Sequence, residues 1–275
     1  LVLHDLTRLN RLEHIRQDFV ANVSHELKTP ITAIRGYVET LLDGALDDTD
    51  NARRFLDIVL RQAGRLGAIV DDLLTLSRIE NRDGHEAITL APAEVRPVLE
   101  SDMQTCAVQA AERGIEVRVE GDRALRAIIN APLLEQAVIN LLQNAITYSP
   151  SGAQVVLRSE AGRNSEGVEE VRLRVIDNGP GIGREHPGRL FERFYRVDKG
   201  RSRELGGTGL GLAIVKHIAL IHNGVVGVES EVGKGSVFTI RLPVLTRRLT
   251  PEPRLGRMNS PTKNRHHEPP RTNGK

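Results

Sequence analysis

His25 and Glu26 are two neighbouring residues whose types could carry out chemistry. They lie in a segment whose apolar residues recur at steps of three or four, as in a helix with one buried stripe: Phe19, Val23, Leu27, Ile31, Ile34, Val38 and Leu41. His25 is two residues past Val23 and therefore about 200° around the helix from it, at about 100° per residue. A histidine on the solvent-exposed face of a helix is accessible to reactants. Pro30 is expected to bend the helix just beyond it. A plain surface histidine near a kink would give the same pattern, so this segment alone does not decide the function.

Three glycine-rich clusters lie in the second half of the chain, at residues 177–183, 206–212 and 233–236. The first follows a strand pattern, the second opens a helix pattern and the third turns a hairpin. Glycines let backbone N–H groups approach phosphate oxygens, and a helix N-terminus adds a favourable partial charge. Each cluster by itself is explained equally well as a turn, and the spacing matches neither a P-loop nor a dinucleotide-binding fingerprint.

Asn140 and Asn144 are one helical turn apart and share a face. Their amide oxygens suit a hard cation such as Mg²⁺ that bridges phosphates, although two asparagines alone are more often a solvated surface. The stretch 183–205, between the first two glycine clusters, is polar with interspersed aromatic residues. A long loop of this kind inside a compact domain is typical of a mobile lid, and its aromatic residues are Phe191, Phe194 and Tyr195.

Two long helices are predicted to position His25, over residues 7–46 and 51–82. In the second, apolar residues alternate steps of four and three as in a heptad seam, with Gln62 as one polar member. Thr49 or Asp50 is the expected N-cap of this helix. A lone hairpin leaves apolar surface in water, so we expect a second copy to pair with it into a dimeric four-helix bundle.

The remaining pattern predicts an α+β sandwich rather than a doubly wound sheet, because strands and helices mix without a regular repeat. Gly114 is expected to close the first helix of this unit and Asn130 to cap the second. Leu1–Leu6 is interpreted as the last strand of a preceding domain. The predicted elements are a short strand near residue 88, helices at 93–113, 130–148 and 208–222, and strands at 115–120, 154–159, 171–176 and in a hairpin at 225–242.

Composition narrows the class of protein. The single cysteine, Cys106, excludes an intrachain disulfide, and no apolar run approaches the roughly 18 residues of a membrane span, so the chain as given is expected to be soluble. The segment from Arg247 to the end has eight Lys/Arg and two Asp/Glu, a charge of +6, which leaves −4 for the rest of a chain of net charge +2. A basic tail on an acidic remainder argues against nucleic-acid binding, and the prolines of the tail predict disorder.

Taken together, the motifs resemble those of two-component sensor histidine kinases. Residues 23–30 are similar to the phosphoacceptor box of that family and 140–144 to its N box. Its first glycine box, F box and second glycine box resemble residues 177–183, 191–196 and 206–212. These five motifs occur in the order of the family, and the resemblance covers about residues 11 to 244. The sequence of residues 37–44 is most similar to that of the phosphate-limitation sensor kinases.

The resemblance implies that His25 is phosphorylated from ATP and passes the phosphoryl group to an aspartate of a response regulator receiver domain. Glu26 would accept the ring proton of His25 or orient the ring. Thr29, one turn on, would position water when the enzyme acts as a phosphatase. The hairpin would form a homodimer.

For the nucleotide, the resemblance implies that Asn144 holds Mg²⁺ with Asn140 near it. Tyr148 would lie against the nucleotide, and Asp177 would accept the adenine amino group of ATP. The rest of the site would be backbone, with glycines that let the lid close and two N–H donors to the phosphates: Gly179, Gly181, Gly183, Gly207, Gly209 and Gly211, with Thr208 and Leu210 as the donors.

The resemblance also implies a division into domains. Residues 1–10 would be the remnant of a PAS-like sensor domain, 11–83 the dimerisation and phosphotransfer hairpin, 84–92 a linker, 93–244 the catalytic ATP-binding domain and 245–275 a disordered basic tail. The chain would be the cytoplasmic portion of a sensor anchored in the inner membrane through a missing N-terminal part.

Thr147 departs from the family pattern, because a Lys or Arg that reaches a phosphate often stands there. A lid cation, Arg193, Arg196 or Lys199, is the expected replacement. Two other functions fit part of the sequence. A gyrase- or chaperone-type ATPase would carry a catalytic Glu where this chain has Asn140, and a scaffold that binds a regulator without phosphorylating it is favoured by Thr147 alone.

Overall fold

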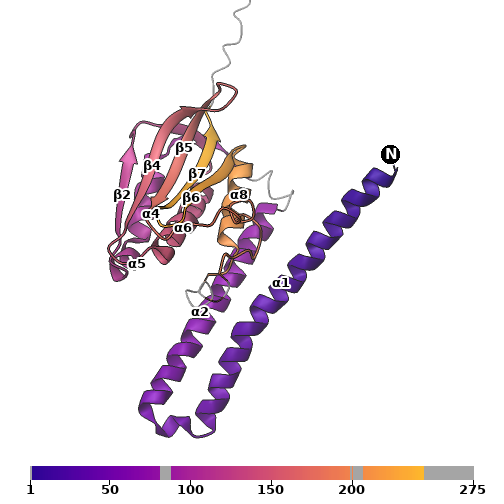
Figure 1. The fold of residues 1–275 in the computed structure, drawn as a ribbon, viewed down its shortest axis with the longest axis vertical. Helices are drawn as coiled ribbons and strands as arrows, with labels where there is room; N and C mark the ends of the chain where they lie inside the picture. Colours follow the sequence, from indigo (N-terminus) through magenta and orange to yellow (C-terminus); the bar gives the residue numbers. More distant parts are fainter. Residues whose placement is uncertain (1, 81–87, 199, 201–206, 245–275) are drawn as a thin grey trace, which may run out of the picture. The chain divides into compact units, whose positions relative to one another are not determined.

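The structure is a computed structural model that describes residues 2–80, 88–198, 200 and 207–244, with only the backbone for residues 2–12 and 14–16. Its first part is a hairpin of two long helices, α1 (Val2–Leu42) and α2 (Thr49–Glu80), joined through the short 3₁₀ helix η1 (Ala45–Asp47) (Figure 1). The predicted helical hairpin is therefore confirmed.

The ends of the hairpin helices differ from the prediction. Val2–Leu6 lies within α1, so the interpretation of this stretch as a strand is wrong. The backbone N–H groups of Asp50 and Asn51 both donate to Oδ1 of Asp48 at 3.2 Å, which makes Asp48 the cap of α2 in place of the expected Thr49 or Asp50. Pro30 is buried and α1 continues through it.

Apolar residues of the hairpin divide into two sets. Leu41, of the apolar stripe predicted for the first helix, and Ile69 and Leu76, of the heptad seam predicted for the second, are buried within the single chain. A second set remains exposed on the two helices, with exposed fractions between 39% and 74%: Val20, Ile31, Val38, Leu42, Leu56, Leu60, Val70 and Leu74. A hairpin in isolation thus leaves a long apolar surface in contact with water.

The second part is built on a five-stranded mixed sheet in the order β2-β4-β5-β7-β6. Only the β2–β4 pair is parallel, and β1 and β3 form a separate antiparallel pair. The strands are β1 (Ala91–Glu94), β2 (Glu116–Gly121), β3 (Arg126–Ile129), β4 (Gln154–Arg163), β5 (Glu169–Asp177), β6 (Val225–Glu231) and β7 (Gly235–Pro243). Helices packed against such a sheet confirm the predicted α+β sandwich.

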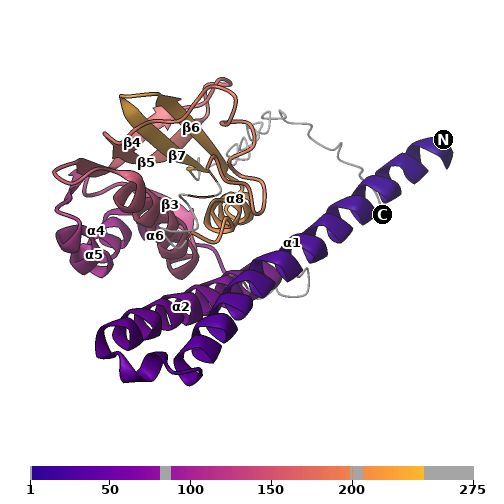
Figure 2. The same ribbon diagram turned by 60° about the horizontal axis from the view of Figure 1, so that its bottom comes forward.

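The helices of this part are α4 (Arg96–Thr105), α5 (Ala107–Glu112), α6 (Ala131–Tyr148) and α8 (Gly211–Ile221). They lie along one face of the sheet (Figure 2). The helix expected at 93–113 is divided at Cys106 and begins only at Arg96, and β3 was not predicted. Asn130 caps α6 as expected, because its side chain accepts the backbone N–H of Leu133 at 3.2 Å.

His222 joins the two helices that carry the glycine and asparagine motifs. Its Nε2 accepts the backbone N–H of Asn130, at the start of α6, at 3.0 Å. Its Nδ1 lies 2.8 Å from the carbonyl oxygen of Ile218 in α8, so the proton is on Nδ1. Burial lowers the pKa of His222 and favours this neutral form. The start of α6 and the end of α8 are thereby held together.

The sequence beyond residue 244, including the predicted basic tail, lies outside the described residues, as do residues 84–87 of the predicted linker. The last two residues of that linker belong to β1. Within the part of the chain that is described, no helix combines the length and the apolar character needed to span a bilayer.

Candidate functional site

Asp177 ends β5 with a carboxylate in a fixed orientation. Its Oδ1 accepts the backbone N–H of Gly179 at 2.9 Å, and the backbone N–H of Ser236 also donates to the side chain. Burial raises the pKa of Asp177, and the two hydrogen bonds oppose that rise. A half-buried carboxylate held in this way can accept a hydrogen bond from an amino group of a ligand.

The first glycine cluster passes close to other backbone. Gly181 has φ +70°, and a Cβ there would lie 2.0 Å from the carbonyl oxygen of Glu231, so only glycine fits. A Cβ at Gly179 would meet Oγ of Ser149 at 3.2 Å, which places this cluster against the C-terminal end of α6. Gly183 follows in the same loop.

Helix α6 lies between the first and second glycine clusters and contacts both. The Nδ2 of Asn140 donates to the carbonyl oxygen of Gly211, the first residue of α8, at 3.3 Å. Asn144, one turn further, is half-buried, and its side chain has no hydrogen bond among the residues that the structure describes. Tyr148 ends α6, next to the first glycine cluster. Three of the side chains predicted to bind a nucleotide, those of Asn140, Asn144 and Tyr148, therefore lie along one helix.

The second glycine cluster forms the entry to α8. Gly209 has φ +77°, and its carbonyl oxygen accepts the backbone N–H of Phe194 at 2.7 Å. The Oγ1 of Thr208 accepts the backbone N–H of Leu210 at 3.1 Å. Leu210 is buried and caps α8, which begins at Gly211 rather than at the predicted Thr208.

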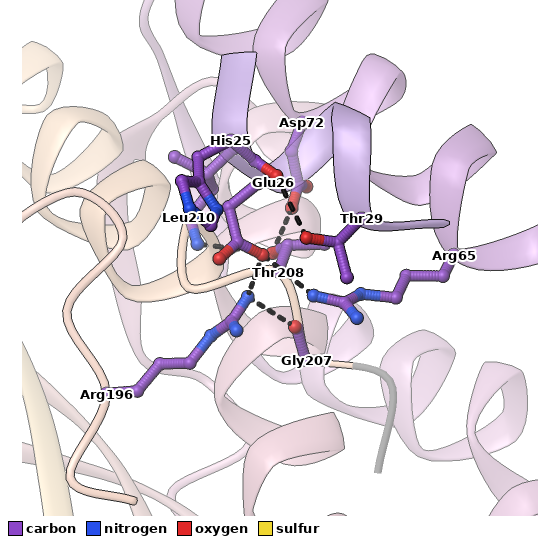
Figure 3. A network of polar contacts seen from close by, with 9 residues as sticks. All are labelled: His25, Glu26, Thr29, Arg65, Asp72, Arg196, Gly207, Thr208 and Leu210. Carbon is purple, nitrogen blue, oxygen red and sulfur yellow. Dashed lines mark hydrogen bonds and ion pairs between the residues drawn. The ribbon is translucent and has the colours of Figure 1, made fainter. Parts of the chain in front are cut away.

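The hairpin presents His25 on the surface of α1, as expected from its place opposite the apolar stripe. The hydroxyl of Thr29 donates to the carbonyl oxygen of His25 at 3.1 Å, so the two residues stay one turn apart on one side of the helix. Oε2 of Glu26 accepts hydrogen bonds from Nη2 of Arg65, on α2, at 2.7 Å and from Nη2 of Arg196 at 3.0 Å (Figure 3).

Arg196 belongs to the predicted F box and links the hairpin to the second glycine cluster. Besides Glu26, its Nη2 donates to the carbonyl oxygen of Gly207 at 2.7 Å (Figure 3). Next to Gly207, the hydroxyl of Thr208 donates to Oδ2 of Asp72, on α2, at 2.6 Å. Burial raises the pKa of Asp72, and this hydrogen bond opposes the rise.

A second group of lid contacts involves Arg193 and Glu80. Arg193 forms an ion pair with Glu80, and its guanidinium lies 5.0 Å from the ring centroid of Phe19. Nε2 of His217, in α8, lies 3.1 Å from Oε1 of Glu80. Burial lowers the pKa of His217, and the negative charge of Glu80 opposes this effect. Arg193 and Arg196, expected to replace a cation at Thr147, thus bind carboxylates of the hairpin in this structure, and Lys199 lies outside the described residues.

Sequence reasoning missed four contributors to this site: Arg65, Asp72, Glu80 and His217. All four take part in contacts between segments that are far apart in sequence. Arg65 could have been recognised in the sequence, because it directly precedes Leu66 of the heptad seam. A charged residue so close to the apolar side of a helix indicates a buried ionic partner.

Comparison with known proteins identifies the two parts. Residues 15–82 match the His Kinase A (phospho-acceptor) domain, and residues 129–246 match the histidine kinase-, DNA gyrase B-, and HSP90-like ATPase domain. Two solved structures share the fold. Acinetobacter baumannii histidine kinase AdeS has a TM-score of 0.60 at 26% identity, over 80% of this chain and 98% of that one. Histidine kinase ThkA in complex with response regulator protein TrrA has a TM-score of 0.68 at 25% identity, over 86% of this chain and 64% of that one.

Curated relatives give the same result. The sensor-like histidine kinase SenX3 of Mycobacterium tuberculosis (strain H37Rv) is 44% identical over 244 residues, which cover 88% of this chain and 57% of SenX3. The phosphate regulon sensor protein PhoR of Pseudomonas aeruginosa is 39% identical over 241 residues, 87% of this chain and 52% of PhoR, which confirms the predicted resemblance to phosphate-limitation sensors. The chain spans about half the length of these relatives. It belongs to the sensor histidine kinases and comprises their phosphoacceptor hairpin and ATP-binding domain.

Proposed function

We propose that this chain transfers the γ-phosphoryl group of ATP to His25 and then to an aspartate of a response regulator. The observation that carries the proposal is the Arg196 contact at Glu26. A residue of the ATP-binding domain, bound to the second glycine cluster, reaches the carboxylate next to an exposed histidine on the hairpin. The nucleotide-binding loops and the phosphoacceptor are thus within reach of each other.

The reaction is a phosphoryl transfer in which the unprotonated ring nitrogen of His25 forms a bond to the γ-phosphorus. The bond from that phosphorus to the bridging oxygen breaks, and ADP leaves. Glu26 accepts the proton from the other ring nitrogen or holds the ring in the reactive orientation. Protein groups contribute mainly by positioning and by neutralising charge in such reactions.

ATP would be held by the groups that surround α6. Asp177 accepts a hydrogen bond from the adenine amino group, and Tyr148 lies against the nucleotide. The glycine loops and the backbone N–H of Thr208 would cover the phosphates. The backbone N–H of Leu210, which donates to Oγ1 of Thr208 in this structure, would have to exchange that hydroxyl for a phosphate oxygen. Asn144 would supply an amide oxygen to Mg²⁺, with Asn140 beside it. The side chain of Asn144 is half-buried and has no hydrogen bond among the described residues, which leaves its amide oxygen available as a ligand. When bound, Mg²⁺ would neutralise charge on the phosphates.

The exposed apolar surface of the hairpin supports a homodimer. Burying that surface against a second copy completes a four-helix bundle and removes eight large apolar side chains from water. The complex of ThkA with TrrA supports a response regulator as the partner. We further propose that the chain is the cytoplasmic portion of a membrane-anchored sensor and that Thr29 positions water for dephosphorylation of the regulator.

The experiment is incubation of the chain with γ-labelled ATP and Mg²⁺, followed by acid or base treatment of the product. A phosphoramidate on His25 is labile in acid and stable in base. Hydrolysis of ATP without label on the protein would support the gyrase- or chaperone-type ATPase. Absence of both label and hydrolysis would support a non-catalytic scaffold.

A further inference from the structure

Arg65 is a buried cation in the interior of the hairpin. Its side chain is 5% exposed, and Ile69, one turn further along α2, is fully buried. A guanidinium in such a place is retained only when an opposite charge meets it, because its removal from water is costly. Glu26 supplies that charge, since its Oε2 is 2.7 Å from Nη2 of Arg65 and its side chain is 12% exposed.

The two arginines at Glu26 come from different parts of the chain. Arg196 belongs to the ATP-binding domain and also holds the carbonyl oxygen of Gly207, whereas Arg65 belongs to the same helical hairpin as Glu26. They approach the carboxylate from opposite sides (Figure 3). The Arg65 contact is therefore made within the hairpin and does not depend on a residue of the ATP-binding domain.

We propose that Arg65 is a positioning residue for phosphorylation of His25. It acts through Glu26: it holds the carboxylate in a fixed position beside His25, where it can accept the ring proton or orient the ring. A charge-assisted hydrogen bond restrains the carboxylate, and a fixed orientation removes a conformational search that would otherwise slow each turnover. This inference rests on the proposed function, in which Glu26 serves His25.

A simple ion pair that stabilises the hairpin would leave the catalytic step unchanged, and the test must separate the two roles. The full chain is assayed for label on His25 over a range of ATP concentrations. For Arg65→Met we expect kcat to fall about tenfold, the effect of one lost charge-assisted hydrogen bond. The KM for ATP should stay within about twofold, because Arg65 does not touch the nucleotide. Arg65→Lys, which restores the charge, should recover most of the rate.

Two controls sharpen the result. Arg61→Met removes an exposed arginine one turn earlier on α2 and should leave kcat within about twofold of the wild type. In a Glu26→Gln background, Arg65→Met should cost almost nothing further, because the group through which it acts is already gone. Circular dichroism checks that each variant retains its helices, and Arg65→Gln replaces Arg65→Met in the cycle if that variant unfolds.

Equal losses from Arg65→Met in the two backgrounds would overturn the proposal, and so would a loss confined to the KM for ATP. Equal losses from Arg61→Met and Arg65→Met would overturn it as well. These outcomes leave the proposed function intact if the wild type is labelled on His25. A wild-type chain that binds ATP without such labelling would overturn the proposed function itself, and the role of Arg65 with it.

Discussion

Replacement of Asp102 by asparagine should change how the stability of the ATP-binding domain depends on pH. Asp102 lies in α4, is fully buried, and neither of its carboxylate oxygens has a hydrogen-bond partner among the described residues. Burial, aided by the negative charge of Glu135, raises its pKa from 3.8 to about 8. Folded Asp102 therefore stays protonated up to about pH 8, whereas in the unfolded chain it ionises near pH 4.

The sign follows from proton binding. Between the two pKa values the folded state binds one more proton than the unfolded state, so the free energy of unfolding falls as the pH rises. Each pKa unit corresponds to 1.36 kcal/mol, so between pH 4 and pH 7 the loss is about 4 kcal/mol. Asp102→Asn cannot ionise and lacks this loss. Relative to the wild type, the variant should gain about 4 kcal/mol of stability over this pH range.

Cys106 provides a local probe for this measurement. It is the single cysteine of the chain, is 2% exposed, and follows α4 directly. At each pH, the protein is equilibrated in a series of denaturant concentrations at fixed protein concentration and exposed to a short pulse of a thiol reagent. The labelled fraction, normalised to the fully unfolded chain at the same pH, gives the fraction of unfolded domain. Asp57→Asn, at an exposed position of α2, is the matched control.

The quantity to compare is the difference in the free energy of unfolding between wild type and variant, followed as the pH changes. A buried asparagine amide destabilises the variant by a similar amount at every pH, so it shifts this difference without changing its dependence on pH. If the stabilities of wild type and Asp102→Asn run parallel from pH 4 to pH 8, Asp102 does not hold a proton in the folded domain, and the reasoning from its burial is refuted.

The remaining predictions concern the proposed reaction. His25→Gln should abolish phosphorylation and keep the affinity for ATP, measured by equilibrium binding, because His25 lies on the hairpin; a lost affinity would contradict the division into two domains. Asn144→Ala should remove Mg²⁺-dependent ATP turnover, and unchanged labelling at His25 would rule out the N-box assignment. Thr29→Ala should keep kinase activity and slow dephosphorylation of the regulator, so equal losses of both activities would count against a water-positioning role. Thr147→Lys should change the rate or affinity for ATP only modestly in titrations of autophosphorylation, whereas a large gain would show that the native enzyme lacks a phosphate-binding cation.

Elements with local signals were predictable from the sequence. The heptad seam of α2, the cap at Asn130 and the glycine turn that ends α5 at Gly114 all appear in the structure, because each depends on residues within one or two turns. β3 was missed because it is four residues long and exists through its pairing with β1, which lies more than thirty residues earlier. Val2–Leu6 was predicted as a strand and is helical, because a short apolar stretch has too few residues to distinguish a strand from the start of a helix.

The candidate site divides in the same way. His25, Asn140 and Asp177 were predicted because each lies in a motif that is continuous in sequence. Arg65 and Asp72 were not predicted, because their partners, Glu26 and Thr208, are distant along the chain. A charge on α2 indicates a solvated surface as readily as a buried contact. Long-range pairing of polar groups has no periodicity that could be read from one sequence.

The topology also sets an order of folding. The contacts between α1 and α2 cross only the short turn at 43–48, whereas β2 pairs with β4 across α6, and β5 pairs with β7 across α8. Chains form contacts between near neighbours faster than contacts that close long loops. During synthesis the hairpin therefore emerges and folds while the sheet is still incomplete. In the proposed homodimer, two nascent chains would be able to pair through their hairpins before either has a complete ATP-binding domain, so the choice of partner would precede the ability to bind ATP.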